Sequence, residues 1–160
     1  MRGIRLSPSG IFIPVALRFM AGRRRPDAPA LTVTAGTSPA TIDSITGIRV
    51  GPNESVYVEA DVHSLVAGGA TDVTLDVVLT PTAPAGAPTV LRAQTSAAVA
   101  IGQTAHNSIR ERVSGLAKNT YTVSYTLTTV GAGTAVVAPA PSGSASLFVW
   151  LVDDSSAGAP

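Results

Sequence analysis

Hydrophobic and polar residues alternate along several stretches of this chain, most clearly in Ser55–His63, SVYVEADVH. One set of alternate positions is apolar, and the other is polar or aromatic: Val56, Val58, Ala60 and Val62 against Tyr57, Glu59, Asp61 and His63. Because successive side chains of a β-strand point to opposite faces, this pattern predicts a half-buried strand. A helix would spread the same charges around its circumference.

The two-residue period recurs in Thr71–Thr80 and Asn119–Thr129, whereas Ser146–Val152 is apolar on both faces, as expected of a central or subunit-interface strand. Weaker runs predict further strands at Leu31–Ala35, Ile45–Val50, Thr89–Gln94, Ala97–Ile101, Ser108–Val113 and Ala135–Ala138, with a polar connection at Gly102–Asn107. No segment between them has a helical period. Short strands separated by Gly- and Pro-containing turns predict an all-β protein, an antiparallel jelly-roll β-sandwich with an extended N-terminal arm.

Residues 1–30 fit no regular element well, because Pro8, Pro14, Pro26 and Pro29 favour extended backbone. Val15–Ala21 has room for one or two helical turns after Pro14. A signal peptide is disfavoured because three arginines follow the apolar patch, and the patch is too short to span a bilayer. Two alternatives remain: an arm that docks on a partner or neighbouring subunit, which we favour, or a first strand of the domain itself. We predict three regions: the arm at 1–30, the sandwich at 31–153 and a polar tail at 154–160.

Charge divides the chain in the same place. Residues 1–30 carry six arginines and one aspartate, a net +5, whereas residues 31–160 carry five basic and nine acidic residues, a net −4. For the arginines at 23–25 we therefore favour docking to an acidic protein surface over a solvated linker or nucleic-acid binding. No aromatic residues interleave these arginines, which argues against nucleic-acid binding. Charged residues make up only 13% of the chain, which favours extensive contact with other protein. Cysteine is absent, so disulfides and thiolate chemistry are excluded.

Candidate catalytic and metal-binding residues are few. His63 and His106 are the only histidines, and Asp61 or Glu111 would complete a metal site with them. A solvated strand face explains the same alternation more simply. No nucleophile elbow, phosphate loop or zinc spacing occurs, and Asp72, Asp76, Asp153 and Asp154 are explained by an outward strand face and a charged chain end. We therefore predict no catalytic residues, no cofactor and no metal.

From about Gly51 to Val152 the sequence resembles the TNF-like jelly-roll modules of phage structural proteins and bacterial surface fibres. The resemblance rests on SVYVEADVH, TDVTLDVVLT, SGLAKNTYTVSYTL and SASLFVWLVDD. It implies a homotrimer that serves as a capsid decoration protein, a head fibre or a tail adhesin.

Together these observations predict a non-enzymatic phage structural protein on the capsid surface of the virion. It would be a trimeric decoration protein whose partners are itself and the major capsid protein, without nucleic acid or membrane. The alternatives are a fibre adhesin for a host glycan or protein, a secreted bacterial surface module, and a sugar-active or metal enzyme. The predicted partner-binding residues are Ile11, Phe12, Ile13, Leu17, Arg18, Phe19, Arg23, Arg24 and Arg25. The predicted trimer-interface or core residues are Tyr121, Tyr125, Phe148 and Trp150.

Overall fold

β-Strands make up nearly all of the part of the chain that the structure describes, and no α-helix occurs in it. The structure is a computed structural model that describes residues 2–6, 12–24, 30–35, 39–137 and 145–154. Its strands are β1 (Arg2–Leu6), β2 (Phe12–Arg24), β3 (Leu31–Thr34), β4 (Ala40–Val50), β5 (Glu54–Ala67), β6 (Thr71–Pro81), β7 (Thr89–Val99), β8 (Thr104–Val113), β9 (Asn119–Gly131), β10 (Thr134–Val137) and β11 (Ala145–Asp153).

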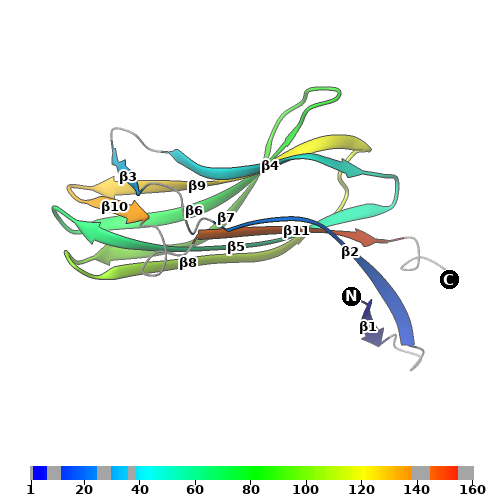
Figure 1. Ribbon diagram of the computed structural model, residues 1–160, viewed down its shortest axis with the longest axis horizontal. Coiled ribbons are helices and arrows are strands. Elements are labelled where there is room, and N and C mark those ends of the chain that lie inside the picture. Colours follow the sequence, from blue (N-terminus) through cyan, green and yellow to red (C-terminus); the bar gives the residue numbers. More distant parts are fainter. Residues whose placement is uncertain (1, 7–11, 25–29, 36–38, 138–144, 155–160) are drawn as a thin grey trace.

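The strands form two antiparallel sheets that stack as a sandwich (Figure 1). The first sheet has the order β1-β2-β11-β5-β10-β3, and β8 also pairs with β5. Val62 of β5 pairs with both Ala145 of β11 and Asn107 of β8, so β8 lies along the opposite edge of β5. The second sheet has the order β4-β9-β6-β7. The predicted all-β class and antiparallel sandwich are confirmed.

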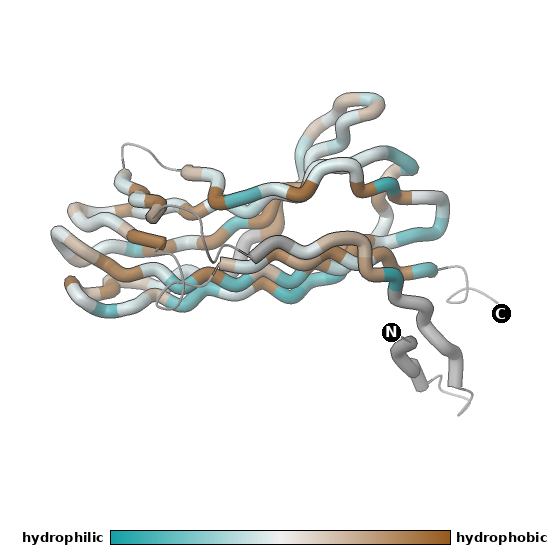
Figure 2. The backbone as a smooth tube through the Cα atoms, in the orientation of Figure 1, coloured by the Kyte–Doolittle hydropathy of each residue, from teal (hydrophilic) through white to brown (hydrophobic). Residues whose placement is uncertain are grey.

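The core lies between the two sheets and consists of the alternate residues that point inward. Figure 2 shows hydrophobic and hydrophilic positions alternating along the strands of the sandwich. The main inward residues are Val56, Val58, Ala60 and Val62 of β5, Leu147, Val149 and Leu151 of β11, Val73, Leu75, Val77 and Leu79 of β6, and Tyr121, Val123, Tyr125 and Leu127 of β9. Asn107 is also buried, and its side-chain amide donates to the carbonyl of Val73 at 3.2 Å, which links the two sheets.

Residues 12–24 form one long strand, contrary to the prediction that residues 1–30 fit no regular element and that Val15–Ala21 has room for helical turns. Pairing explains the difference: Leu17 lies opposite Val152 and Arg24 opposite Ser146, so β11 supplies the backbone partners of this half of β2. Met20 and Ala21 pack against the core. The predicted connection at residues 102–107 is also partly wrong, because β8 begins at Thr104. β8 pairs antiparallel with β5, and Thr104 lies opposite Leu65.

The first half of β2 leaves the sandwich. Residues 12–16 pair only with β1, with Leu6 opposite Phe12 and Arg2 opposite Ala16. We call this two-stranded unit, residues 2–6 and 12–16, the projection. Figure 1 shows it extending away from the stacked sheets near the end where β11 finishes. The segment predicted to be one extended arm therefore divides into two parts. The projection is a separate hairpin, and residues 17–24 are a strand of the subunit's own sheet.

Candidate interaction face

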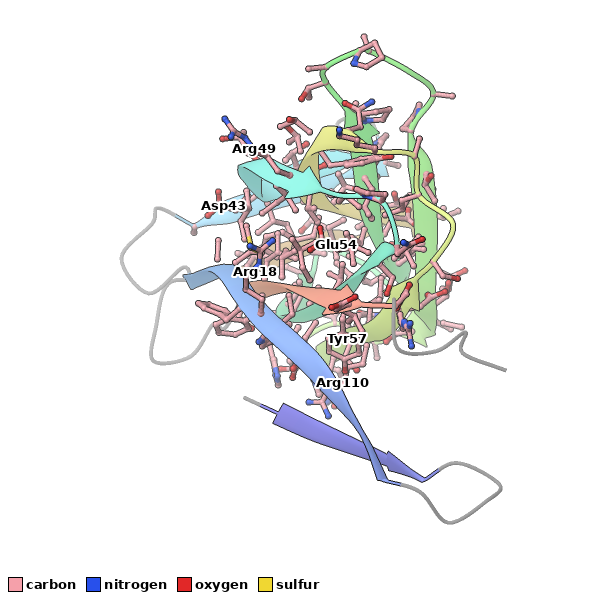
Figure 3. All side chains as sticks on the ribbon, turned by 90° about the vertical axis from the view of Figure 1, so that its right-hand side faces the viewer. Arg18, Asp43, Arg49, Glu54, Tyr57 and Arg110 are labelled. Carbon is pink, nitrogen blue, oxygen red and sulfur yellow. The ribbon has the colours of Figure 1, made fainter. Side chains whose placement is uncertain are left out.

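The face of the first sheet that points away from the core carries most of the unusual side chains. On β11, β5 and β8 the residues between the core positions point outward and stand side by side, because these three strands pair without a register shift. The pairing of β2 with β11 shifts register between Val149 and Trp150, and beyond the shift Phe19 lies opposite Trp150. Figure 3 shows two of them, Tyr57 and Arg110, on the side of the sheet that faces away from the second sheet. We call this surface the outer face.

One end of the outer face holds four aromatic rings, the aromatic cluster of Phe19, Tyr57, Phe148 and Trp150. Trp150 is central: its ring centroid lies 5.6 Å from Phe19, 5.6 Å from Tyr57 and 5.9 Å from Phe148. Phe19 is 55% exposed, although aromatic side chains are usually well buried. Gly22 lies opposite Phe148, and any Cβ there would overlap the Phe148 ring, so glycine at this position allows the ring to lie over β2.

Charged pairs lie on both sides of the first sheet, and one of them occupies the middle of the outer face. Arg110 contacts Glu59 at 3.1 Å and Asp61 at 3.9 Å between side-chain nitrogen and oxygen. Arg18 of β2 contacts Glu54 of β5 at 3.3 Å, and Figure 3 shows this pair on the opposite side of the first sheet, the side that faces the second sheet. These side chains are substantially exposed on the arginine side, so each pair contributes little to stability, on the order of 0–1 kcal/mol. Their effect is to fix the direction of the carboxylates.

Arg112 holds Asp154, the residue that directly follows β11. It donates to the Ser55 hydroxyl at 2.8 Å and forms an ion pair with Asp154. The Asp154 backbone N–H also donates to the carbonyl of Asn53 at 2.7 Å. Asp154, which the sequence assigned to a polar tail, is thus held by the sandwich, and residues 155–160 lie outside the described residues.

The other end of the outer face carries Asp61, His63 and His106, the histidine cluster. His63 and His106 are directly opposite each other on β5 and β8, and their rings stack with centroids 4.0 Å apart. His106 Nε2 lies 2.9 Å from Asp61 Oδ1. Burial lowers the pKa of His63, the charge of His106 lowers it further, and Asp61 acts in the opposite direction.

The predicted partner-binding residues are divided by the structure. Leu17, Arg18 and Phe19 lie on the part of β2 that pairs with β11, and Phe19 packs on the chain's own Trp150. Arg23 and Arg24 are paired with Leu147 and Ser146 in the same sheet. Phe12 and Ile13 belong to the projection. Ile11 and Arg25 lie outside the described residues.

The four predicted trimer-interface or core residues also separate into two groups. Tyr121 and Tyr125 are buried between the sheets, whereas Phe148 and Trp150 are half-buried on the outer face. Of the candidate metal ligands, Asp61, His63 and His106 come together, and Glu111 does not. Sequence reasoning missed Tyr57 and Phe19 as neighbours of Trp150, because only the pairing of β2, β11 and β5 brings these positions together.

The two stacked antiparallel sheets, with core side chains between them, define the class as a jelly-roll β-sandwich, and solved viral structures share this fold. The chain is similar to the VP2 subviral particle of infectious bursal disease virus, with a TM-score of 0.58 and 10% identity over 95% of this chain and 41% of that chain. The T=1 particles derived from the same virus give a TM-score of 0.58, 11% identity and coverage of 95% and 39%. For the Gx strain of that virus the TM-score is 0.57 with 12% identity and coverage of 95% and 40%.

At such low identity these similarities define the fold alone. The chain also spans only about 40% of the length of the viral chains that it matches. No protein-family model matches the sequence, and the curated proteins give no match. No helix among the described residues is long and apolar enough to cross a membrane.

Proposed function

We propose that this chain is a non-enzymatic structural protein of a virus particle, a TNF-like jelly-roll module that sits on the capsid surface as a homotrimeric decoration protein. The projection and the arginine-bearing half of β2 would contact the major capsid protein, and the aromatic cluster would form the trimer contact. The similarity to VP2 of infectious bursal disease virus in assembled particles supports the structural role.

The observation that carries the proposal is the division of β2. Its second half is fixed in the sheet by β11, whereas its first half pairs with β1 alone. A two-stranded hairpin by itself is at best marginally stable in water. The sequence of the projection is rich in large apolar residues, namely Ile4, Leu6, Phe12, Ile13 and Val15. A partner surface that buries such residues gains about 1.5–3 kcal/mol for each one, which is enough to order the hairpin.

Charge supports the direction of docking. The arm carries a net +5, and the rest of the chain a net −4. Two of the six arginines, Arg2 and Arg5, belong to the projection, and no acidic residue does. The projection and the arginine-bearing half of β2 therefore fit an acidic surface, where arginines form paired hydrogen bonds with carboxylates. Three projections on one trimer would engage three equivalent sites, so the later contacts form at a high effective concentration.

Two measurements test the proposal. The mass in solution, measured by analytical ultracentrifugation, should be three times the chain mass of 16.1 kDa. Trp150→Ala together with Phe19→Ala should shift the protein toward monomer, whereas Ile101→Ala, at an exposed apolar residue in the β7–β8 turn, should leave the trimer intact. A trimer that survives loss of both rings contradicts the aromatic contact.

The second measurement is cosedimentation with capsids assembled from the major capsid protein of the same virus. A chain lacking residues 2–16 should stay folded and trimeric but no longer bind these capsids. Undiminished binding of that truncated chain would contradict the docking role of the projection. Binding to host cells, without binding to capsids, would instead support the fibre-adhesin alternative.

A further inference from the structure

We propose that Asp61, His63 and His106 bind one divalent transition-metal ion, of which Zn²⁺ is the representative, on the outer face of the sandwich. This goes beyond the proposed structural role and differs from the sequence prediction, which favoured no metal. One ligand atom from each of the three side chains lies within 4.8 Å of the others.

Strand register produces this convergence. Asp61 and His63 are two residues apart on β5, so they share the outer face. His106 is the residue of β8 directly opposite His63, where facing Cβ atoms are typically about 4.5–5.5 Å apart. Three potential ligands from two neighbouring, hydrogen-bonded strands are therefore held on a rigid support. Glu111 is an odd number of residues from His106, so the alternation places it out of phase with this group.

The ligand distances suit a tetrahedral ion after a small movement. Zinc binds imidazole nitrogen at about 2.0–2.1 Å and carboxylate oxygen at about 2.0–2.2 Å, which sets neighbouring ligand atoms roughly 3.4 Å apart. His106 Nε2 and Asp61 Oδ1 lie 2.9 Å apart, so they would open slightly to admit the ion. The remaining ligand atom, a ring nitrogen of His63, lies within 4.8 Å of the other two and would move inward by rotation of the His63 side chain. Two imidazoles and a carboxylate leave the fourth position for water.

The surroundings favour a cation. Arg110 contacts Glu59 at 3.1 Å and the second oxygen of Asp61 at 3.9 Å, so one positive charge faces two negative ones. The guanidinium is directed to Asp61 Oδ2, and Oδ1 is the oxygen next to His106.

Isothermal titration calorimetry of the full chain with ZnCl₂ at neutral pH tests the site. Any affinity tag must be removed first, because the chain has only two histidines of its own and a polyhistidine tag would bind the ion. We expect saturable binding of one Zn²⁺ per chain, reversed by EDTA. His106→Ala and Asp61→Asn should each weaken binding by more than about tenfold, since even an outer-shell partner commonly contributes that much.

Glu111→Gln is the matched control, because it removes a carboxylate from the same strand as His106 without touching the cluster, and it should bind Zn²⁺ like the unmodified chain. Circular dichroism shows whether each variant is folded, and His106→Gln replaces His106→Ala if the alanine variant is not. NMR provides the second readout: the ring resonances of both histidines should shift together on titration. The proposal is wrong if no saturable binding occurs at millimolar Zn²⁺, or if binding survives the loss of His106.

Discussion

Truncation after residue 16 and truncation after residue 25 should have different consequences, because they cut β2 on either side of its entry into the sheet. Removing residues 2–16 deletes the projection and leaves Leu17–Arg24 paired with β11. Removing residues 2–25 also uncovers the edge of β11, a strand with Leu147, Val149 and Leu151 on one face and Phe148 and Trp150 on the other. A long apolar strand with an unpaired edge is a template for aggregation.

The size of the stability difference comes mainly from Phe19. Its ring lies 5.6 Å from Trp150 and 6.4 Å from Phe148. Each aromatic pair contributes about 0.5–1.5 kcal/mol, so losing both costs about 1–3 kcal/mol. The lost backbone hydrogen bonds of β2 and the regained freedom of its residues oppose each other. Since 1 kcal/mol lowers Tm by roughly 2–4 °C in a chain of this size, the longer truncation should melt roughly 2–12 °C below the shorter one.

Size-exclusion chromatography and differential scanning calorimetry compare the two truncated chains at equal concentration. The shorter truncation should elute as a defined species and melt close to the full chain. The longer truncation should form aggregates that grow with concentration, and adding Phe19→Ala to the shorter one should reproduce the lower Tm without the aggregation. Two truncated chains that behave identically in both assays would refute the assignment of Leu17–Arg24 as a protective strand.

Two further predictions follow from the described residues. The free energy of unfolding should decrease as the pH falls through about 6.5, because burial lowers the pKa of His63 in the folded state and the unfolded chain then binds the proton more tightly. Urea unfolding of His63→Asn should show a smaller decrease over the same interval. Gly133→Ala should destabilise the protein by roughly 1–3 kcal/mol, because its Cβ would overlap the backbone carbonyl oxygen of Gly69, and neither backbone can give way easily. Ala132→Ser, at the exposed neighbouring position, should unfold at the same urea concentration as the unmodified chain.

The strands that alternate most cleanly were predictable because their pattern is local. Ser55–His63, Thr71–Thr80 and Asn119–Thr129 lie within β5, β6 and β9, and their apolar positions are the core positions. The hairpin turn at Gly68 was predictable for the same reason: a glycine adopts its φ of +75° without a steric penalty. In each of these cases one stretch of sequence contains the whole cause.

Features that depend on pairing between distant strands were not predictable. Residues 12–24 contain Pro14, are followed by Pro26 and have an irregular apolar pattern, so their sequence does not predict a strand. They form one nonetheless, because β11 provides an edge with which residues 17–24 pair. The contact of Phe19 with Trp150 requires that edge as well. His63 and His106 are 43 positions apart in the sequence, and only the register of β5 with β8 places them opposite each other.

The outward faces of the two sheets differ in chemistry, and this difference bears on which face forms the trimer contact that we propose. On the second sheet the outward residues of β9 are mostly hydroxylic, namely Thr120, Thr122, Ser124, Thr126 and Thr128, with the exposed Val130 at the end of the strand. On neighbouring strands Thr74 and Thr95 hydrogen-bond at 2.8 Å. The hydroxyl groups of such a surface form hydrogen bonds with water and with each other across neighbouring strands. The outer face of the first sheet instead exposes a cluster of aromatic rings beside the strand that leads into the projection. Burying those rings against another subunit removes more apolar area from water than burying the mainly hydroxylic face of the second sheet would. A trimer built through the second sheet would therefore have to leave the aromatic cluster in solvent, which is the less favourable arrangement.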